Sequence, residues 1–157
     1  MKPNIGIADS SRHALVTSLN TLLADEYALY TKTRNFHWNV IGPQFNDLHK
    51  FFESQYEALD DFVDDVAERA RTLGGRALGT LAEFAARTRL EEHPGGVPDA
   101  KSMISELAAD HATVIRLLRD DVDLAVKHGD TGTSDFLTGL MEQHEKMAWM
   151  LRAFLEG

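Results

Sequence analysis

Residues 34–75 read RNFHWNVIGPQFNDLHKFFESQYEALDDFVDDVAERARTLGG, and this stretch decides the fold. Gly42-Pro43 interrupts it, because a glycine followed by a proline cannot continue a helix and favours a turn. Apolar side chains on both sides of the turn recur at three- and four-residue steps, the period of an amphipathic helix. Gly74-Gly75 closes the second half, as glycine does just past the last helical turn. The stretch therefore predicts two helices joined by a turn.

The same period extends over the rest of the chain and predicts four long helices in all. A longer connection, residues 76–98, separates the second helix from the third, and Thr80 can cap a short helix within it. The predicted long helices begin near Asp9 or Ser10, Asn46, Asp99 and Ser134, and they end before Pro43 and near Leu73, His128 and Leu155.

Four such helices with one long crossing predict an all-α fold, a four-helix bundle with a short helix in the crossing between helices two and three. The crossing lets helices two and three run parallel while each pairs with an antiparallel neighbour. The predicted division is a short N-terminal tail over residues 1–8 and a single domain over residues 9–157.

Composition narrows the class of protein. The 157 residues carry a formal net charge of -9 and contain no cysteine, so disulfides and thiolate metal sites are excluded. The N-terminal sequence lacks the apolar core of a signal peptide, and no window approaches ~20 unbroken apolar residues, the length of a membrane helix. We therefore expect a cytoplasmic protein without membrane contact. Its negative charge favours cations as partners over phosphate backbones or anionic lipids.

Histidines and carboxylates gather on one face of the second predicted helix. At ~100° per residue, with His49 at 0°, Glu53 falls near 40°, Asp64 near 60° and Glu68 near 100°. His37 lies before the turn and can fold back beside His49. Imidazole nitrogens and carboxylate oxygens suit divalent first-row metals, iron and zinc among them. The alternative is an ordinary solvated acidic face.

Distance along the helix divides these residues into two clusters. At ~1.5 Å per residue, Glu53 and Asp64 are roughly 16 Å apart, and His49 and Glu68 about 28 Å. No single ion can reach both ends. A two-fold axis between antiparallel second helices of two chains would bring the clusters together, twice per dimer. A di-iron site inside one bundle normally uses Glu-x-x-His motifs, and no Glu in this chain has a His three residues later.

The segment HWNVIGPQFNDLHKFFESQYEALDDFVDDVAER resembles the signature of the Dps family, the mini-ferritins named as DNA-binding proteins from starved cells. The leading helix, GTLAEFAARTRLEE in the crossing and TSDFLTGLMEQHEKMAWMLRAFL near the end fit the family pattern as well. The resemblance implies a bundle of ferritin-like type and a hollow shell of twelve subunits, with a ferroxidase centre at each two-fold interface. It implies one or two irons per centre, oxidised preferably by hydrogen peroxide and otherwise by dioxygen, and storage of ferric mineral inside the shell.

The ligands that the resemblance implies match the two clusters. One subunit would supply His37, His49 and Glu53, and the other Asp64 and Glu68. Trp38 matches a family tryptophan near the iron, and interface packing is its other role. In the family, acidic residues at the start of the last helix line a three-fold pore, which here implies the pair Asp130 and Asp135. The remaining histidines have no partners at ligand spacing and are interpreted as structural or solvated: His13, His93, His111, His128 and His144.

Direct DNA binding is not expected, although the family name suggests it. Family members that bind DNA tend to use mobile tails rich in Lys and Arg, and here Lys2 is the single basic side chain before the first predicted helix. Binding to phosphates gains free energy from several such cations. Two alternatives to a ferroxidase stay open at this point: a DNA-compacting shell with secondary iron chemistry, and a purely structural bundle.

Overall fold

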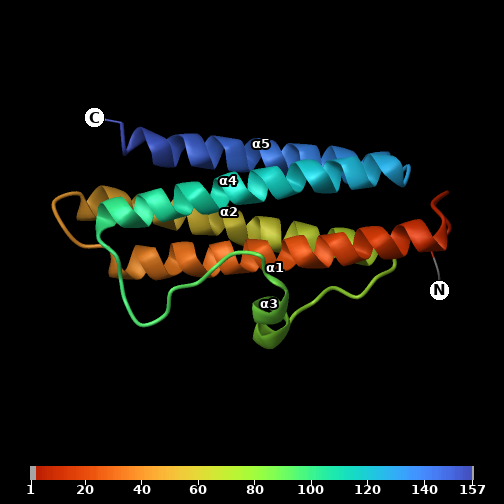
Figure 1. Cartoon of the computed structure of the whole chain (residues 1–157), viewed down its shortest axis with the longest axis horizontal. Helices are drawn as coiled ribbons and strands as arrows, with labels where there is room; N and C mark the ends of the chain where they lie inside the picture. Colours follow the sequence, from red (N-terminus) through yellow and green to blue (C-terminus); the bar gives the residue numbers. More distant parts are fainter. Residues whose placement is uncertain (1–2, 157) are drawn as a thin grey trace.

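Four long helices run side by side in the computed structural model, which describes residues 3–156 (Figure 1). α1 and α2 form one antiparallel pair and α4 and α5 the other, while the connection from α2 to α4 returns along the bundle, so that α2 and α4 run parallel (Figure 1). This confirms the predicted all-α bundle with a short helix in the crossing. The helices are α1 Asp9–Asn39, α2 Phe45–Thr72, α3 Leu81–Arg87, α4 Ala100–Lys127 and α5 Thr131–Ala153.

The turn between α1 and α2 forms where the sequence predicted it. α1 stops at Asn39, and Gly42 has φ 114°, a value that side chains other than glycine rarely adopt. At the far end of α2, Gly74 has φ 85° and the Gly75 N–H donates to the carbonyl of Ala70 at 3.1 Å. This bond satisfies a carbonyl that the helix end would otherwise leave unpaired.

α1 begins at Asp9, as predicted, whereas the expected start of α5 is wrong. Ala8 occupies the N-cap of α1 without a side-chain hydrogen bond, while the carboxylate of Asp9 accepts from Arg12. α5 begins three residues earlier than predicted, because the side chain of Asp130 accepts from the Thr133 N–H and caps the helix there. The predicted tail over residues 1–8 includes residues 1 and 2, which lie outside the described part, as does residue 157; the division into tail and domain stays a prediction.

The core is a continuous column of buried apolar side chains along the bundle axis, leucines above all. The leucines that set the period of the first helix are each at most 2% exposed, and they meet apolar side chains of α2, α4 and α5. Burial of such side chains contributes roughly 1.5–3 kcal/mol each before the entropy of ordering is subtracted. Among residues 3–156, no helix combines the length and the apolar character that a membrane span needs.

The short helix α3 carries the predicted cap. Thr80 accepts from the Glu83 N–H at 3.2 Å, and the Glu83 carboxylate accepts from the Thr80 N–H at 3.2 Å, which makes a reciprocal capping box. The Arg76 guanidinium, together with the hydrogen bonds from Gly79 and Thr80, lowers the pKa of Glu83 to about 2. These local hydrogen bonds fix the start of α3 within the crossing segment.

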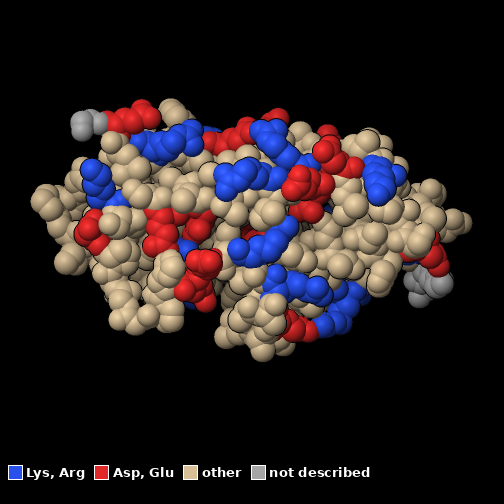
Figure 2. Space-filling view, viewed as in Figure 1, with Lys and Arg blue, Asp and Glu red and all other residues tan. Residues whose placement is uncertain are grey.

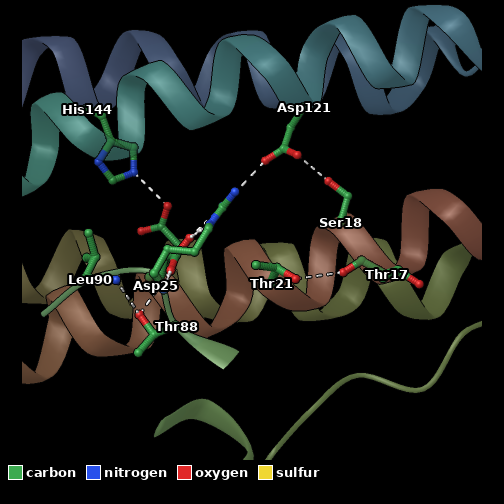
Figure 3. Close-up of polar contacts among 10 residues, drawn as sticks. Thr17, Ser18, Thr21, Asp25, Thr88, Leu90, Asp121 and His144 are labelled. Atoms are coloured by element: carbon green, nitrogen blue, oxygen red, sulfur yellow. Dashed lines mark hydrogen bonds and ion pairs between the residues drawn. The ribbon is translucent and has the colours of Figure 1, made fainter. Parts of the chain in front are cut away.

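A buried carboxylate then fastens the crossing segment to α1. Asp25 is fully buried and accepts from the Thr88 hydroxyl at 3.0 Å and from the Arg89 N–H at 2.6 Å. The Arg89 side chain binds the other oxygen of Asp25 through Nε at 2.8 Å and through Nη2 at 2.6 Å. Figure 3 labels Asp25 and Thr88 of this contact, and Asp121 of α4 nearby. The long crossing is therefore held by charge as well as by apolar packing.

The substitution Arg89→Ala should destabilise the fold by about 3 kcal/mol, because it leaves the buried Asp25 without its cation while two hydrogen bonds remain. Denaturant unfolding of both proteins measures the difference. The matched control is Arg87→Ala in the same segment, where the exposed side chain should contribute less than about 0.5 kcal/mol. Equal losses in the two variants would contradict a specific role for the pair.

Candidate metal centre

His37 and His49 face one another across the α1–α2 turn. The two rings stack with centroids 3.8 Å apart and an interplanar angle of 20°. The Nδ1 of His37 lies 2.7 Å from the backbone carbonyl of His49, and the Nδ1 of His49 lies 2.9 Å from the carbonyl of His37. The structure thus brings the two histidines together, as the turn between them predicted.

These reciprocal bonds fix the tautomer of both rings. A carbonyl oxygen can only accept, so each Nδ1 must carry a hydrogen and donate it. In a neutral imidazole the other nitrogen, Nε2, then has a free lone pair. A hydrogen bond from the second ring nitrogen to a carbonyl is the usual arrangement of histidines that ligate metals. The pair therefore offers two pre-oriented nitrogen ligands without needing any third residue.

Glu53 lies one helical turn beyond His49 on α2 and is partly exposed. The other near neighbours of the pair are aromatic: Tyr56 packs edge-on against the His37 ring at 5.2 Å, and Phe45 stacks on the His49 ring at 5.1 Å. Burial, and to a lesser degree the charges of Glu53 and Glu57, raise the pKa of Tyr56. The phenol therefore stays protonated and the site gains no charge from it.

Trp38 adjoins the pair but points outward. Its side chain is 63% exposed, and the Arg34 guanidinium lies 4.9 Å from the ring centroid. A large aromatic side chain with that exposure is suited to burial by another molecule. Both roles of Trp38, near the iron and in interface packing, stay predictions.

Asp64 and Glu68 lie on exposed positions of α2, and α2 is continuous from Phe45 to Thr72. The separation expected from helical rise therefore applies to the folded chain. Over residues 3–156, no three His, Asp or Glu side chains of this one chain come together closely enough to hold a metal ion. The five predicted ligands stay a prediction, and one chain alone supplies them in two parts.

A groove of about 510 Å³ runs beside Asp64 between α2 and the crossing segment. Its walls combine acidic and apolar side chains, among them Asp60, Asp61, Leu81 and Phe84. Leu81 is 71% exposed. The Asp64 cluster thus opens onto a surface that has both charge and uncovered apolar area.

The two residues of the predicted pore differ in their surroundings. Asp130 is buried, caps α5 and accepts from the Arg69 guanidinium at 3.0 Å, and these hydrogen bonds lower its pKa although burial opposes them. Its carboxylate is already neutralised within the chain. Asp135 is exposed on α5. The pore assignment stays a prediction, and the exposed Asp135 fits that role better than the buried Asp130.

Sequence reasoning missed a second histidine pair. His111 of α4 and His144 of α5 are both fully buried, with their Nδ1 atoms 2.9 Å apart, and His144 also bonds Glu26 of α1 at 2.8 Å. These residues are 33 and 118 positions apart, so no local spacing could reveal them. An imidazole on the apolar face of each helix was the only available signal.

Comparisons with known proteins agree with this architecture. The profile of the Ferritin-like domain family matches residues 16–157. The chain is 50% identical to an uncharacterized low temperature-induced protein of Nostoc sp. (strain PCC 7120), over 98% of this chain and 87% of that protein. It is 37% identical to the DNA protection during starvation protein 2 of Bacillus anthracis, over 90% of this chain and 96% of the relative.

Solved structures lead to the same family. The crystal structure of the Dps protein from Vibrio cholerae O1, described as a member of a broad superfamily of ferritin-like diiron-carboxylate proteins, superposes with a TM-score of 0.93. The match is 32% identical and covers 99% of this chain and 97% of that one. With the bundle, the histidine pair and these relatives in agreement, the chain belongs to the Dps family of ferritin-like proteins.

Proposed function

We propose that this protein is a ferroxidase and iron store that oxidises Fe(II), preferably with hydrogen peroxide, and keeps the ferric product inside a twelve-subunit shell. One observation carries the proposal: the reciprocal bonds of His37 and His49, which leave two Nε2 lone pairs free at the end of an acidic helix. Family membership supports the reaction class, since the Vibrio relative is a diiron-carboxylate protein by its description.

The residues suit the chemistry. The carboxylate oxygens of Glu53, Asp64 and Glu68 are hard donors that stabilise Fe(III) relative to Fe(II). An imidazole nitrogen can bind iron in either oxidation state. Few protein ligands leave positions open for the oxidant. The balanced reaction is 2 Fe(II) + H2O2 + 2 H⁺ → 2 Fe(III) + 2 H2O. Peroxide then takes up two electrons together, which avoids the one-electron step that releases hydroxyl radical.

A second copy of the chain would complete each site. The groove beside Asp64 and the uncovered side chains of Trp38, Ile41 and Leu81, at 63%, 79% and 71% exposure, supply apolar area for such a contact. Patches of this kind mark interaction sites in soluble proteins. A two-fold contact would place the histidine cluster of one protomer against Asp64 and Glu68 of its partner, twice per dimer.

DNA compaction is the second candidate, because several curated relatives carry the name DNA protection during starvation protein. The charge opposes direct binding. The formal net charge is -9, and Lys and Arg side chains are interspersed with Asp and Glu on the face shown in Figure 2. Removal of iron and peroxide would protect DNA without contact, so the name fits the proposed chemistry as well.

Anaerobic loading with Fe(II), followed by hydrogen peroxide, tests the reaction. We expect ferric absorbance to rise faster than in the protein-free control, with little hydroxyl radical in a spin-trap assay. An oxidation rate equal to that control would reject the ferroxidase.

Replacement of single ligands should slow the reaction. In His37→Ala or Asp64→Ala the initial oxidation rate should fall at least about tenfold, since even residues that only orient metal ligands cost that much. Asp65→Ala is the matched control, because this exposed carboxylate neighbours Asp64 on α2 but points about 100° away around the helix. A similar fall in Asp65→Ala would indicate a general charge effect and not ligation.

Mixed assemblies test whether the site is shared. Chains with His37→Ala and chains with Asp64→Ala each lack part of every site, whereas an interface between the two variants can contain one intact site. Dissociating and reassembling the mixture should restore part of the activity. Mass spectrometry must confirm that both chains are in one particle; mixed particles without activity would place the ligands within one subunit.

A gel-shift assay separates the two functions. At an ionic strength of about 0.15 M, where the Debye length is about 8 Å, we expect no retention of duplex DNA by the metal-free protein. Stable retention under these conditions would favour the compacting shell.

A further inference from the structure

Three buried polar side chains form a hydrogen-bonded chain across the middle of the bundle. Glu26 of α1 lies 2.8 Å from the Nε2 of His144 on α5, and the Nδ1 of His144 lies 2.9 Å from the Nδ1 of His111 on α4. All three side chains are fully buried. Figure 3 shows the His144 ring pointing from its helix toward α1, where the dashed line marks the first of these bonds. We name these residues the core relay.

The fourth long helix, α2, contributes an apolar contact to the core relay. α2 presents the Phe62 ring, 5.5 Å from the His144 ring. The nearby buried acids have partners of their own: Asp25 is held by Arg89, and Asp121 accepts from Ser18 and lies 3.9 Å from Arg89 (Figure 3). Within the described residues, the contacts of Glu26 therefore come from an imidazole and not from Lys or Arg.

Both ends of the core relay are unpaired. The Oε2 of Glu26 and the Nε2 of His111 are buried atoms without a hydrogen-bond partner. If His111 is neutral and donates from Nδ1 to His144, its bare Nε2 is a buried lone pair. One hydrogen lies between the two Nδ1 atoms and another between His144 and Glu26, so any further proton on the two imidazoles would form an N–H without a partner at the Nε2 of His111. The geometry therefore opposes proton uptake at His111.

Such an arrangement is costly compared with an apolar core. A buried polar group without a partner costs roughly 1–3 kcal/mol, and replacement of buried polar networks by packed apolar side chains is often neutral or stabilising. The leucine column around the core relay shows that the fold can supply apolar side chains at this depth. A function that depends on titration would explain why these positions hold titratable groups.

We propose that the core relay makes the bundle acid-sensitive: as the pH falls below the range in which free imidazole is neutral, the relay favours opening of the bundle over protonation in place. The sign follows from linkage. Burial, together with the neighbouring His144, lowers the pKa of His111 well below its ordinary value of 6.5. Below that value the unfolded chain binds a proton that the folded chain does not, so stability falls with pH until the folded pKa is reached.

The test uses the full, metal-free chain, so its outcome is independent of iron oxidation. Denaturant unfolding is measured from pH 8 to pH 5 at one protein concentration for the native sequence and for His111→Asn. Asn can donate from the position of Nδ1 but cannot take up a proton. Below pH 6.5, the folding equilibrium constant of the native sequence should fall by up to tenfold per pH unit more than that of the variant.

The matched control is His13→Asn, since His13 is exposed on α1 and its loss should leave the pH profile of the native sequence unchanged. Identical profiles for the native sequence and His111→Asn would overturn the proposal. If His111→Asn does not fold, the imidazole signals of the native chain decide instead. NMR titration of the folded chain should show no proton uptake by His111 near pH 6.5, and titration of His111 near that pH would reject the acid-sensitive relay.

Discussion

The reciprocal bond between His37 and His49 joins fold and site in one contact. Each imidazole donates to the backbone carbonyl of the other residue, so the pair closes the end of the α1–α2 hairpin and leaves the lone pair of each Nε2 free. The glycine at position 42, with φ 114°, allows the chain to reverse closely enough for the two carbonyls to be reached. A histidine oriented by backbone keeps its direction even when other side chains vary, because the carbonyls belong to the helix ends themselves.

The rigidity of α2 then decides how a metal centre can be built. A straight helix cannot bring residues 11 or 19 positions apart to one ion, so the acidic and histidine clusters must either act separately or meet through a second chain. Exposure of Asp64 and Glu68, and of apolar side chains close to each cluster, fits the second solution. A shared site of this kind couples assembly to ligation: an isolated chain would hold incomplete sites, and iron would be oxidised only where two chains have met.

Local signals explain which predictions succeed. The turn at Gly42-Pro43, the cap at Thr80 and the start of α4 after Asp99 each depend on residues within a few positions, and the structure confirms them. The start of α5 was placed near Ser134, three residues too late, because only the contacts of Asp130 with Thr133 and Arg69 identify it as the cap. The stacking of His37 on His49 follows from the turn, but their exchange of carbonyl bonds needs the folded geometry. The residues of the core relay come from three helices. They lie so far apart in the sequence that no helical period relates one to another.

Two histidine pairs in one bundle show how surroundings decide what an imidazole can do. At the α1–α2 turn, backbone carbonyls accept both Nδ1 hydrogens, and each Nε2 keeps a free lone pair. In the centre, the donors and acceptors of His111 and His144 are directed at one another and at Glu26, and the remaining Nε2 of His111 meets no partner. Any change at the second pair must be absorbed by the packing of the four helices around it. The same side chain thus keeps a free Nε2 lone pair beside the turn, whereas in the centre the remaining lone pair of His111 is buried without a partner.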